Sequence, residues 1–336
     1  MLLFLWMGLA LANQPLVVAE PAQAAAIESS TPAPPTQREL LDEAVAMRRI
    51  GAFDDASQLL KRAAAEPGRD AEQIRYQQGV LAEVTEQWTD AIDAYEDVAA
   101  RWPDSSSAQD ARFRRAYCLE ELGDHKAATR AVKQLQRDGR WSIDDERTMA
   151  LQRGITELRS GKSRRGIRRI LKALDSGQDE RTWIRAKARL ALVRAQLAAA
   201  AKIKLKGDKK AARRLVKRAK LLEAGEHQAI VMFKLNEPEF ALEGLLLLGD
   251  GYVSLYDALV LAPPPRKVKD TEAFMKAVRQ KGAILRTKAL ARYDEGVRVA
   301  ARTQWVGSVT QRLMTKRDDL AAQLASDGAS DAGGVR

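Results

Sequence analysis

The sequence holds few residues whose type and spacing could support catalysis or metal binding. Its two histidines, His125 and His227, lie about a hundred residues apart, and Cys118 is the single cysteine in a chain of 336 residues. A metal site needs several ligands at short spacing, and a nucleophile needs a base beside it. We therefore expect no catalytic, metal-binding or cofactor-binding residue, with His125 exposed in a turn and Cys118 a small buried side chain.

Two other patterns favour the same conclusion. Gly249-Asp250-Gly251 follows no predicted strand and has no third glycine at the spacing of a phosphate loop. The carboxylate pairs stand beside turns or on solvated helix faces, where helix N-termini favour acidic residues. They are Asp54-Asp55, Asp144-Asp145 and Asp318-Asp319. We expect a binding protein rather than an enzyme.

Charge is segregated along the chain. Residues 1–24 carry a net charge of −1, residues 25–150 carry −7, residues 151–224 carry +17 and residues 225–336 carry +2, which gives the overall +11. The basic block contains GKSRRGIRRILKAL at 161–174, in which the basic residues and the aliphatic residues occupy opposite faces of a predicted helix. Such asymmetry indicates two surfaces for different partners.

One pattern recurs through the chain and predicts its architecture. A small or turn residue is followed five positions later by Ala or Gly, then by apolar residues four and seven positions further on. Two helices of about 14 residues and two turns account for this period, so hairpins with uncovered apolar faces must stack. The five copies begin at Gly51, Glu86, Gly123, Gly161 and Gly207, and their Ala or Gly positions are Ala56, Ala91, Ala128, Gly166 and Ala212.

The second copy, QIRYQQGVLAEVTEQWTDAIDAYEDVAARWP, resembles the tetratricopeptide repeat (TPR) family at Gly79, Ala91, Tyr95 and Pro103, as does LLLLGDGYVSLYDAL further on. The resemblance covers about residues 37–261. It implies an all-α fold, a TPR-like α-solenoid in which hairpins form a right-handed superhelix with long C-terminal helices. In that family the first helices line a concave groove for partner segments. The implied groove positions are Gln73, Tyr76, Val80, Glu83, Asp110, Phe113, Tyr117 and Glu120; the alternative is that their aromatic and apolar side chains pack between hairpins.

The C-terminal half departs from the repeat. The helix expected from Trp183 to Ile203 is long, prolines at 263–265 interrupt the sixth unit, and residues 271–302 predict one long helix in which Ala289 and Tyr293 repeat the Ala91 and Tyr95 pair. We expect a capping helix from about Trp305 to Leu324. The predicted domains are therefore repeats at 37–225, a degenerate repeat with capping helices at 226–325, and a disordered tail at 326–336.

The first residues predict export. An apolar run from Met1 to Ala12 is followed by small residues ending at Ala24, as in a secretory signal peptide cleaved after Ala24, although no basic residue precedes the apolar run. Residues 25–36 have the proline and serine content of a linker. The expected location is the periplasm, with no transmembrane span in the mature chain.

The basic block predicts a charged ridge. Relative to Gly166 and Ala212, basic residues occupy equivalent positions on two second helices, which should stack on the convex side and attract an acidic protein or an anionic surface. These residues are Arg164, Arg168, Lys172, Lys210, Arg214 and Arg218.

These observations predict a non-enzymatic protein–protein interaction scaffold of the bacterial cell envelope. Its expected partners are envelope proteins within an envelope-spanning machine, such as a gliding-motility or outer-membrane assembly complex. The C-terminal half is similar to periplasmic TPR proteins of gliding-motility complexes. The alternative is a nucleic-acid or ribonucleoprotein-binding repeat protein that uses the 151–224 block. An observation against this alternative is that Trp183 is the only aromatic residue of the block that could stack on bases.

Overall fold

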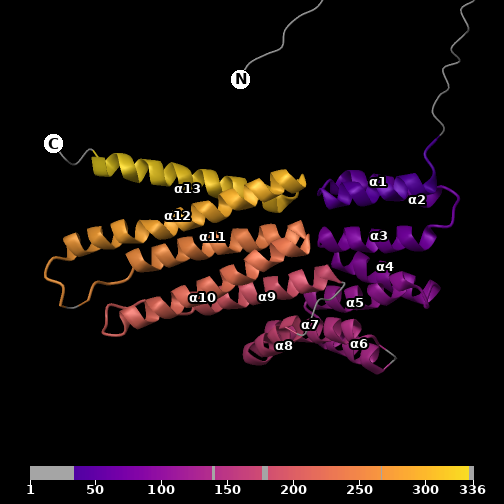
Figure 1. The fold of residues 1–336 in the computed structure, drawn as a ribbon, viewed down its shortest axis with the longest axis horizontal. Helices are drawn as coiled ribbons and strands as arrows, with labels where there is room; N and C mark the ends of the chain where they lie inside the picture. The colour runs from indigo at the N-terminus through magenta and orange to yellow at the C-terminus, as the bar shows by residue number, and fades with distance from the viewer. Residues whose placement is uncertain (1–33, 138–140, 176–180, 266, 333–336) are drawn as a thin grey trace, which may run out of the picture. The chain divides into compact units, whose positions relative to one another are not determined.

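The computed structural model describes residues 34–137, 141–175, 181–265 and 267–332; the predicted signal peptide and most of the linker lie outside them. The chain divides into residues 1–35 and a second unit, Thr36–Arg336, which contains every described helix. No strand occurs among the described residues, so the predicted all-α TPR-like fold is confirmed. The helices (Figure 1) are α1 (Gln37–Arg49), α2 (Phe53–Ala65), α3 (Ala71–Val84), α4 (Trp88–Arg101), α5 (Ser106–Glu121), α6 (His125–Arg137), α7 (Ile143–Arg159), α8 (Ser163–Asp175), α9 (Thr182–Ala201), α10 (Ala211–Met232), the short 3-10 helix η1 (Phe233–Leu235), α11 (Pro238–Val260), α12 (Thr271–Thr303) and α13 (Ser308–Ala332).

The first eight helices form four hairpins that follow the repeat pattern predicted from the sequence. The turn residues Gly51, Gly123 and Gly161 have φ of +83°, +87° and +83°, and Glu86 occupies the same turn at +61°. Glycine adopts this left-handed conformation without steric cost. The Ala or Gly position of each copy and the two apolar positions after it are buried, as the repeat pattern predicts. These residues are Ala56, Leu60, Ala63, Ala91, Tyr95, Val98, Ala128, Val132, Leu135, Gly166, Ile170 and Ala173.

The prediction of a fifth copy of the repeat, beginning at Gly207, is wrong. Ala212 is exposed and Val216 is 53% exposed, whereas the buried stripe of α10 runs through Leu222, Ala229 and Met232. Instead of starting a hairpin turn, Gly207 lies against the backbone carbonyls of the α11–α12 loop, where a Cβ would meet an oxygen at 2.4 Å. Helix α10 packs between α9 and α11 and therefore buries a different face.

The long helix expected at 271–302 is confirmed as α12, which packs along α11. Ala289 and Tyr293 are buried as the counterparts of Ala91 and Tyr95. A Cβ on Gly249 of α11 would meet the Tyr293 ring at 2.1 Å, and one on Gly79 would meet the Tyr95 ring at 2.8 Å. The tyrosine ring thus occupies the space above a glycine in both halves of the chain.

Two boundaries differ from the sequence prediction. The boundary predicted between residues 225 and 226 falls inside α10, which continues unbroken to Met232. Helix α13 extends to Ala332, so residues 326–332 of the predicted tail are helical, and 333–336 lie outside the described residues. Helix α1 begins with a capping box made by Thr36 and Glu39, and the Ser105 side chain caps α5.

The α1–α2 turn contacts the α12–α13 turn. The Val306 amide donates to the Ile50 carbonyl at 2.8 Å, and the Phe53 and Trp305 rings pack nearly perpendicular at 5.8 Å between centroids. A Cβ on Gly51 would meet the Gly307 nitrogen at 3.0 Å. We call this contact the latch; it joins the first hairpin to the last helices (Figure 1).

None of the described helices is apolar over a stretch long enough to span a bilayer.

Candidate partner-binding site

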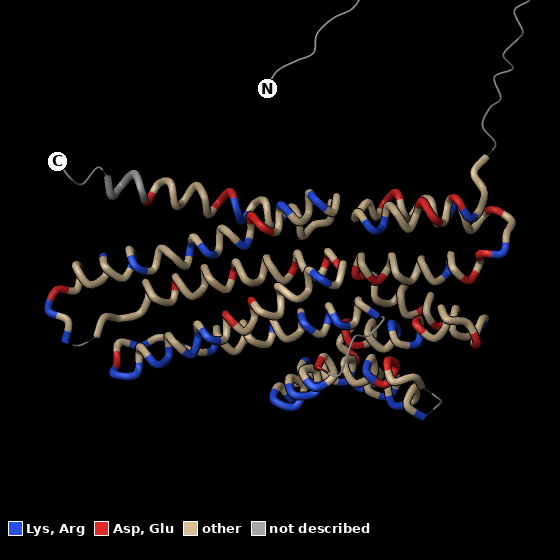
Figure 2. Tube along the Cα trace, viewed as in Figure 1, with Lys and Arg blue, Asp and Glu red and all other residues tan. Residues whose placement is uncertain are grey.

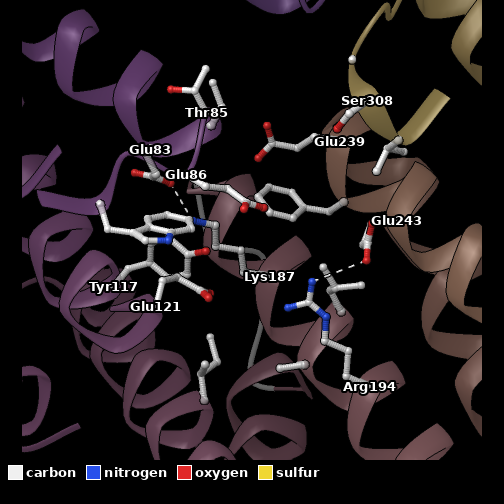
Figure 3. A pocket seen from close by; sticks show the side chains of 18 of the residues that line it. Glu83, Thr85, Glu86, Tyr117, Glu121, Lys187, Arg194, Glu239, Glu243 and Ser308 are labelled. Atoms are coloured by element: carbon white, nitrogen blue, oxygen red, sulfur yellow. Dashed lines mark hydrogen bonds and ion pairs between the residues drawn. The ribbon is translucent and has the colours of Figure 1, made fainter. Parts of the chain in front are cut away.

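A cavity of about 750 Å³ lies among helices from both halves of the second unit. The α3–α4 turn, α5, α7, α9, the start of α11 and the start of α13 all contribute side chains (Figure 3). Its lining combines aromatic surface with charge. The aromatic residues are Phe53, Trp88, Tyr117, Phe240 and Trp305, and the charged ones are Glu83, Glu86, Glu121, Arg159, Lys187, Arg194, Glu239, Glu243 and Arg312.

Glu83 anchors one wall of the cavity. Its carboxylate accepts a hydrogen bond from Lys187 Nζ at 2.6 Å and from the Tyr95 hydroxyl at 2.8 Å, and it pairs with Arg114 at 3.1 Å. Burial alone raises the pKa of Glu83, but attraction to Lys187 and Arg114 outweighs this and holds the pKa below its ordinary value. Glu83 therefore remains ionised and ties α3 to α9 and α5.

A second polar cluster continues from this wall. Asp110 accepts from the Tyr76 hydroxyl, pairs with Arg114 at 2.7 Å and pairs with Arg181 at 3.1 Å. Burial raises the pKa of Tyr76, so its hydroxyl stays protonated as a donor. Beside it, Gln73 donates to Ser107 at 2.7 Å.

The predicted groove residues lie in different surroundings in the structure. Only Glu83 and Tyr117 line the cavity, Tyr117 with Lys187 Nζ 2.8 Å from its ring centroid. Gln73, Tyr76 and Asp110 are partly buried in the adjoining polar cluster. Val80 and Phe113 are packed in the core, and Glu120, fully buried, lies with its Oε1 2.7 Å from His125 Nδ1.

The structure also shows where the two histidines and the single cysteine lie. His125 is half-buried at the first position of α6 rather than exposed in a turn, and His227 is exposed on α10. Cys118 is fully buried as predicted, and burial raises the pKa of its thiol. Among the described residues no cluster of metal-ligating side chains occurs.

Sequence reasoning missed the part of the cavity made by the C-terminal half. The missed residues are Lys187, Arg194, Glu239, Phe240, Glu243, Trp305, Ser308 and Arg312. No signal in the sequence singles out Lys187, because Arg185, Arg189 and Arg194 lie on the same helix. Nothing in the periodicity indicates that α11 and α13 lie opposite the α3–α4 turn.

Glu239 differs from the other carboxylates of the cavity. It occupies the first turn of α11 and points into the space in Figure 3, and no hydrogen bond or ion pair to it is found within the described part of the chain. Burial raises its pKa to about 7; Lys187 and Arg48 oppose this rise, and Glu83 and Glu237 add to it. The positive end of the α11 dipole also favours a carboxylate at this position, yet desolvation remains the larger effect.

The raised pKa of Glu239 predicts a pH-dependent stability. In the unfolded chain this carboxyl ionises near pH 4.5, and in the folded chain it ionises near pH 7, so stability falls as the pH rises between these values. Glu239→Gln removes this loss and should raise the free energy of unfolding by on the order of 2 to 3 kcal/mol at about pH 8, with little change near pH 4. Urea denaturation at both pH values measures the effect; an E239Q protein no more stable than the parent at pH 8 would contradict it.

The predicted basic ridge is only partly present. Arg164, Arg168 and Lys172 are exposed on α8, and Lys210 is exposed before α10. Figure 2 shows basic residues in blue along this part of the chain. Two members differ. Arg214 is partly buried and pairs with Asp208, and Arg218 is 5% exposed, donating to the Ser254 carbonyl and hydroxyl.

Burial lowers the pKa of Arg218. Because α8 packs on α7 and α9 while α10 packs on α9 and α11, the two helices form no continuous ridge, and the prediction for Arg218 is wrong.

The stacked hairpins and the small residues where their helices pack define an all-α helical repeat fold of the TPR type. The family model described as "T7SS, ESX-1 secretion system protein EccA1, N-terminal domain" matches residues 35–193, the region of the first four hairpins and the start of α9.

Among solved structures, the chain is similar to a tetratricopeptide repeat protein from Parabacteroides merdae ATCC 43184, at 14% identity over 84% of this chain and 98% of that one, with a TM-score of 0.35. No curated protein matches the sequence.

Proposed function

We propose that this protein is a non-enzymatic scaffold of the bacterial cell envelope that holds a segment of a partner protein in the cavity. The observation that carries the proposal is the lining of the cavity. Five aromatic side chains share it with carboxylates and basic groups, and aromatic side chains surrounded by polar groups are typical of binding hot spots. Its volume of about 750 Å³ accommodates several side chains of an extended or helical segment.

The envelope location rests on the sequence and on one comparison. The apolar run and small residues up to Ala24 have the pattern of a secretory leader. The matched family is a domain of a secretion-system protein, which supports a place in a machine that moves or assembles proteins at the envelope. The exposed basic side chains of α8 offer a second surface for an acidic partner.

Site-specific crosslinking tests the binding role. Cys118 is fully buried with a raised thiol pKa, so an introduced surface cysteine becomes the reactive thiol. Ser308→Cys places a photoreactive maleimide at the cavity, and Ala219→Cys places it on the exposed side of α10 as the matched control. We expect one envelope protein to be captured by the S308C protein and not by the A219C protein; equal capture by both contradicts a site in the cavity.

Fractionation of cells that express the intact chain tests the location. We expect the protein in the periplasm, shortened by removal of the leader up to Ala24. Recovery of the uncleaved chain in the cytosol contradicts the envelope proposal and favours the nucleic-acid alternative.

A further inference from the structure

The charged groups of the cavity do not balance one another. Each of its four basic side chains is already engaged: Lys187 by Glu83 at 2.6 Å, Arg159 by Glu121, and both Arg312 and Arg194 by Glu243. The cavity has five carboxylates, so two remain without a basic partner among its lining residues. These two are Glu86 and Glu239. Arg48, which does not line the cavity, lowers the pKa of Glu239 but forms no ion pair with it in the described part of the chain.

The two carboxylates lie at different depths. Glu86 is exposed in the α3–α4 turn, whereas Glu239 is partly buried, and burial disfavours its charged form. Figure 3 shows Glu239 extending from the α11 side toward Thr85 and Glu86 on the opposite wall. A buried carboxylate without a partner is costly, and a cation between these walls would reduce that cost.

Aromatic rings complete the surroundings of this space. Trp88, Phe240 and Trp305 line the same cavity, and Lys187 Nζ already stands 5.4 Å from the Phe240 ring centroid. Aromatic faces attract cations and also cover the aliphatic stem of a lysine or arginine. The site is thus suited to a side chain with an apolar stem and a positive end.

We infer that the cavity receives the ammonium or guanidinium group of a lysine or arginine on the partner segment, with Glu239 as its counter-ion and Glu86 at the rim. This inference rests on the proposed function and specifies the partner: the bound segment is basic. An acidic segment is disfavoured, because the four basic side chains that line the cavity are engaged by Glu83, Glu121 and Glu243.

An array of short peptides tests the inference on the full chain. The peptides share apolar flanks, and the central residue is lysine, arginine, glutamine or glutamate; binding is followed by the fluorescence of the cavity tryptophans, with spermidine as a small cation for comparison. We expect lysine and arginine peptides to bind about 10- to 100-fold more tightly than their glutamine counterparts. Glu239→Gln should abolish this difference.

A matched variant separates the site from general charge. Asp257→Asn removes one carboxylate from the same helix at an exposed position outside the cavity, and should change the affinity less than about twofold. Urea denaturation of E239Q confirms that lost binding does not reflect unfolding.

Two outcomes overturn the inference. If peptides bind in the cavity without regard to the central charge or to Glu239, the segment need not be basic, and the proposed function still stands. If spermidine binds through Glu239 and no peptide does, the ligand is a free amine, and the cavity is not a partner site.

Discussion

Gly249→Ala is expected to destabilise the protein by about 3 kcal/mol. The added methyl group would meet the Tyr293 ring at 2.1 Å, and this ring is buried between α11 and α12 and hydrogen-bonded to Asp250 at 2.8 Å. The ring cannot move aside without losing that bond and its packing, so the helices must separate. Chemical denaturation followed by circular dichroism measures the loss.

Gly225→Ala is the matched control. Gly225 is also buried in a long helix, but a Cβ there would meet its nearest neighbours at 3.5 Å, an ordinary contact. Alanine forms helix better than glycine by about 1 kcal/mol, so G225A should be neutral or slightly stabilising. If G249A were as stable as G225A, the close fit of Tyr293 over Gly249 would be wrong.

Glu83→Gln is expected to cost about 3 to 5 kcal/mol. The carboxylate is 3% exposed and neutralises Lys187, which is 6% exposed, and Arg114. Glutamine keeps the volume but leaves a buried ammonium group without a counter-ion, and breaking one side of a buried ion pair is strongly destabilising. The midpoint of urea unfolding at neutral pH measures the effect.

Two further variants show that the buried charge is the cause. The Glu83→Gln, Lys187→Met double variant should be more stable than E83Q alone, because it removes the uncompensated ammonium group. Glu295→Gln breaks an exposed pair with Arg298 and should leave the midpoint of urea unfolding nearly unchanged. A double variant no better than E83Q would show that Glu83 acts through shape rather than charge.

The sequence predicted the parts of the fold that depend on local spacing. The positive-φ turn residues and the buried positions of the first four hairpins follow from residues within one repeat. Tyr293, which repeats Tyr95 in the sequence, is buried like its counterpart. The repeat pattern failed at α10, where Arg218 is buried and donates a hydrogen bond to Ser254 on α11. Residue type alone does not reveal such a partner.

The cavity could be predicted only in part for the same reason. Tyr117 and Glu83 were identified because they occupy repeat positions. Glu239, Trp305 and Arg312 belong to segments outside the repeat, and they reach the cavity because α11 packs against α9 and α13 against α11 and α12. Contacts between segments so distant in sequence carry no periodic signal.

The latch has a consequence for how the chain unfolds. In an open array of repeats, each end contacts one neighbour and can fray without disturbing the rest. Here the Val306–Ile50 hydrogen bond and the Phe53–Trp305 contact give the first hairpin a second neighbour from the other end of the sequence. The terminal hairpin is thereby protected from fraying, and its amide hydrogens should exchange with solvent as slowly as those of the central helices. Closing this contact requires ordering nearly the whole chain first, so the latch should form late in folding.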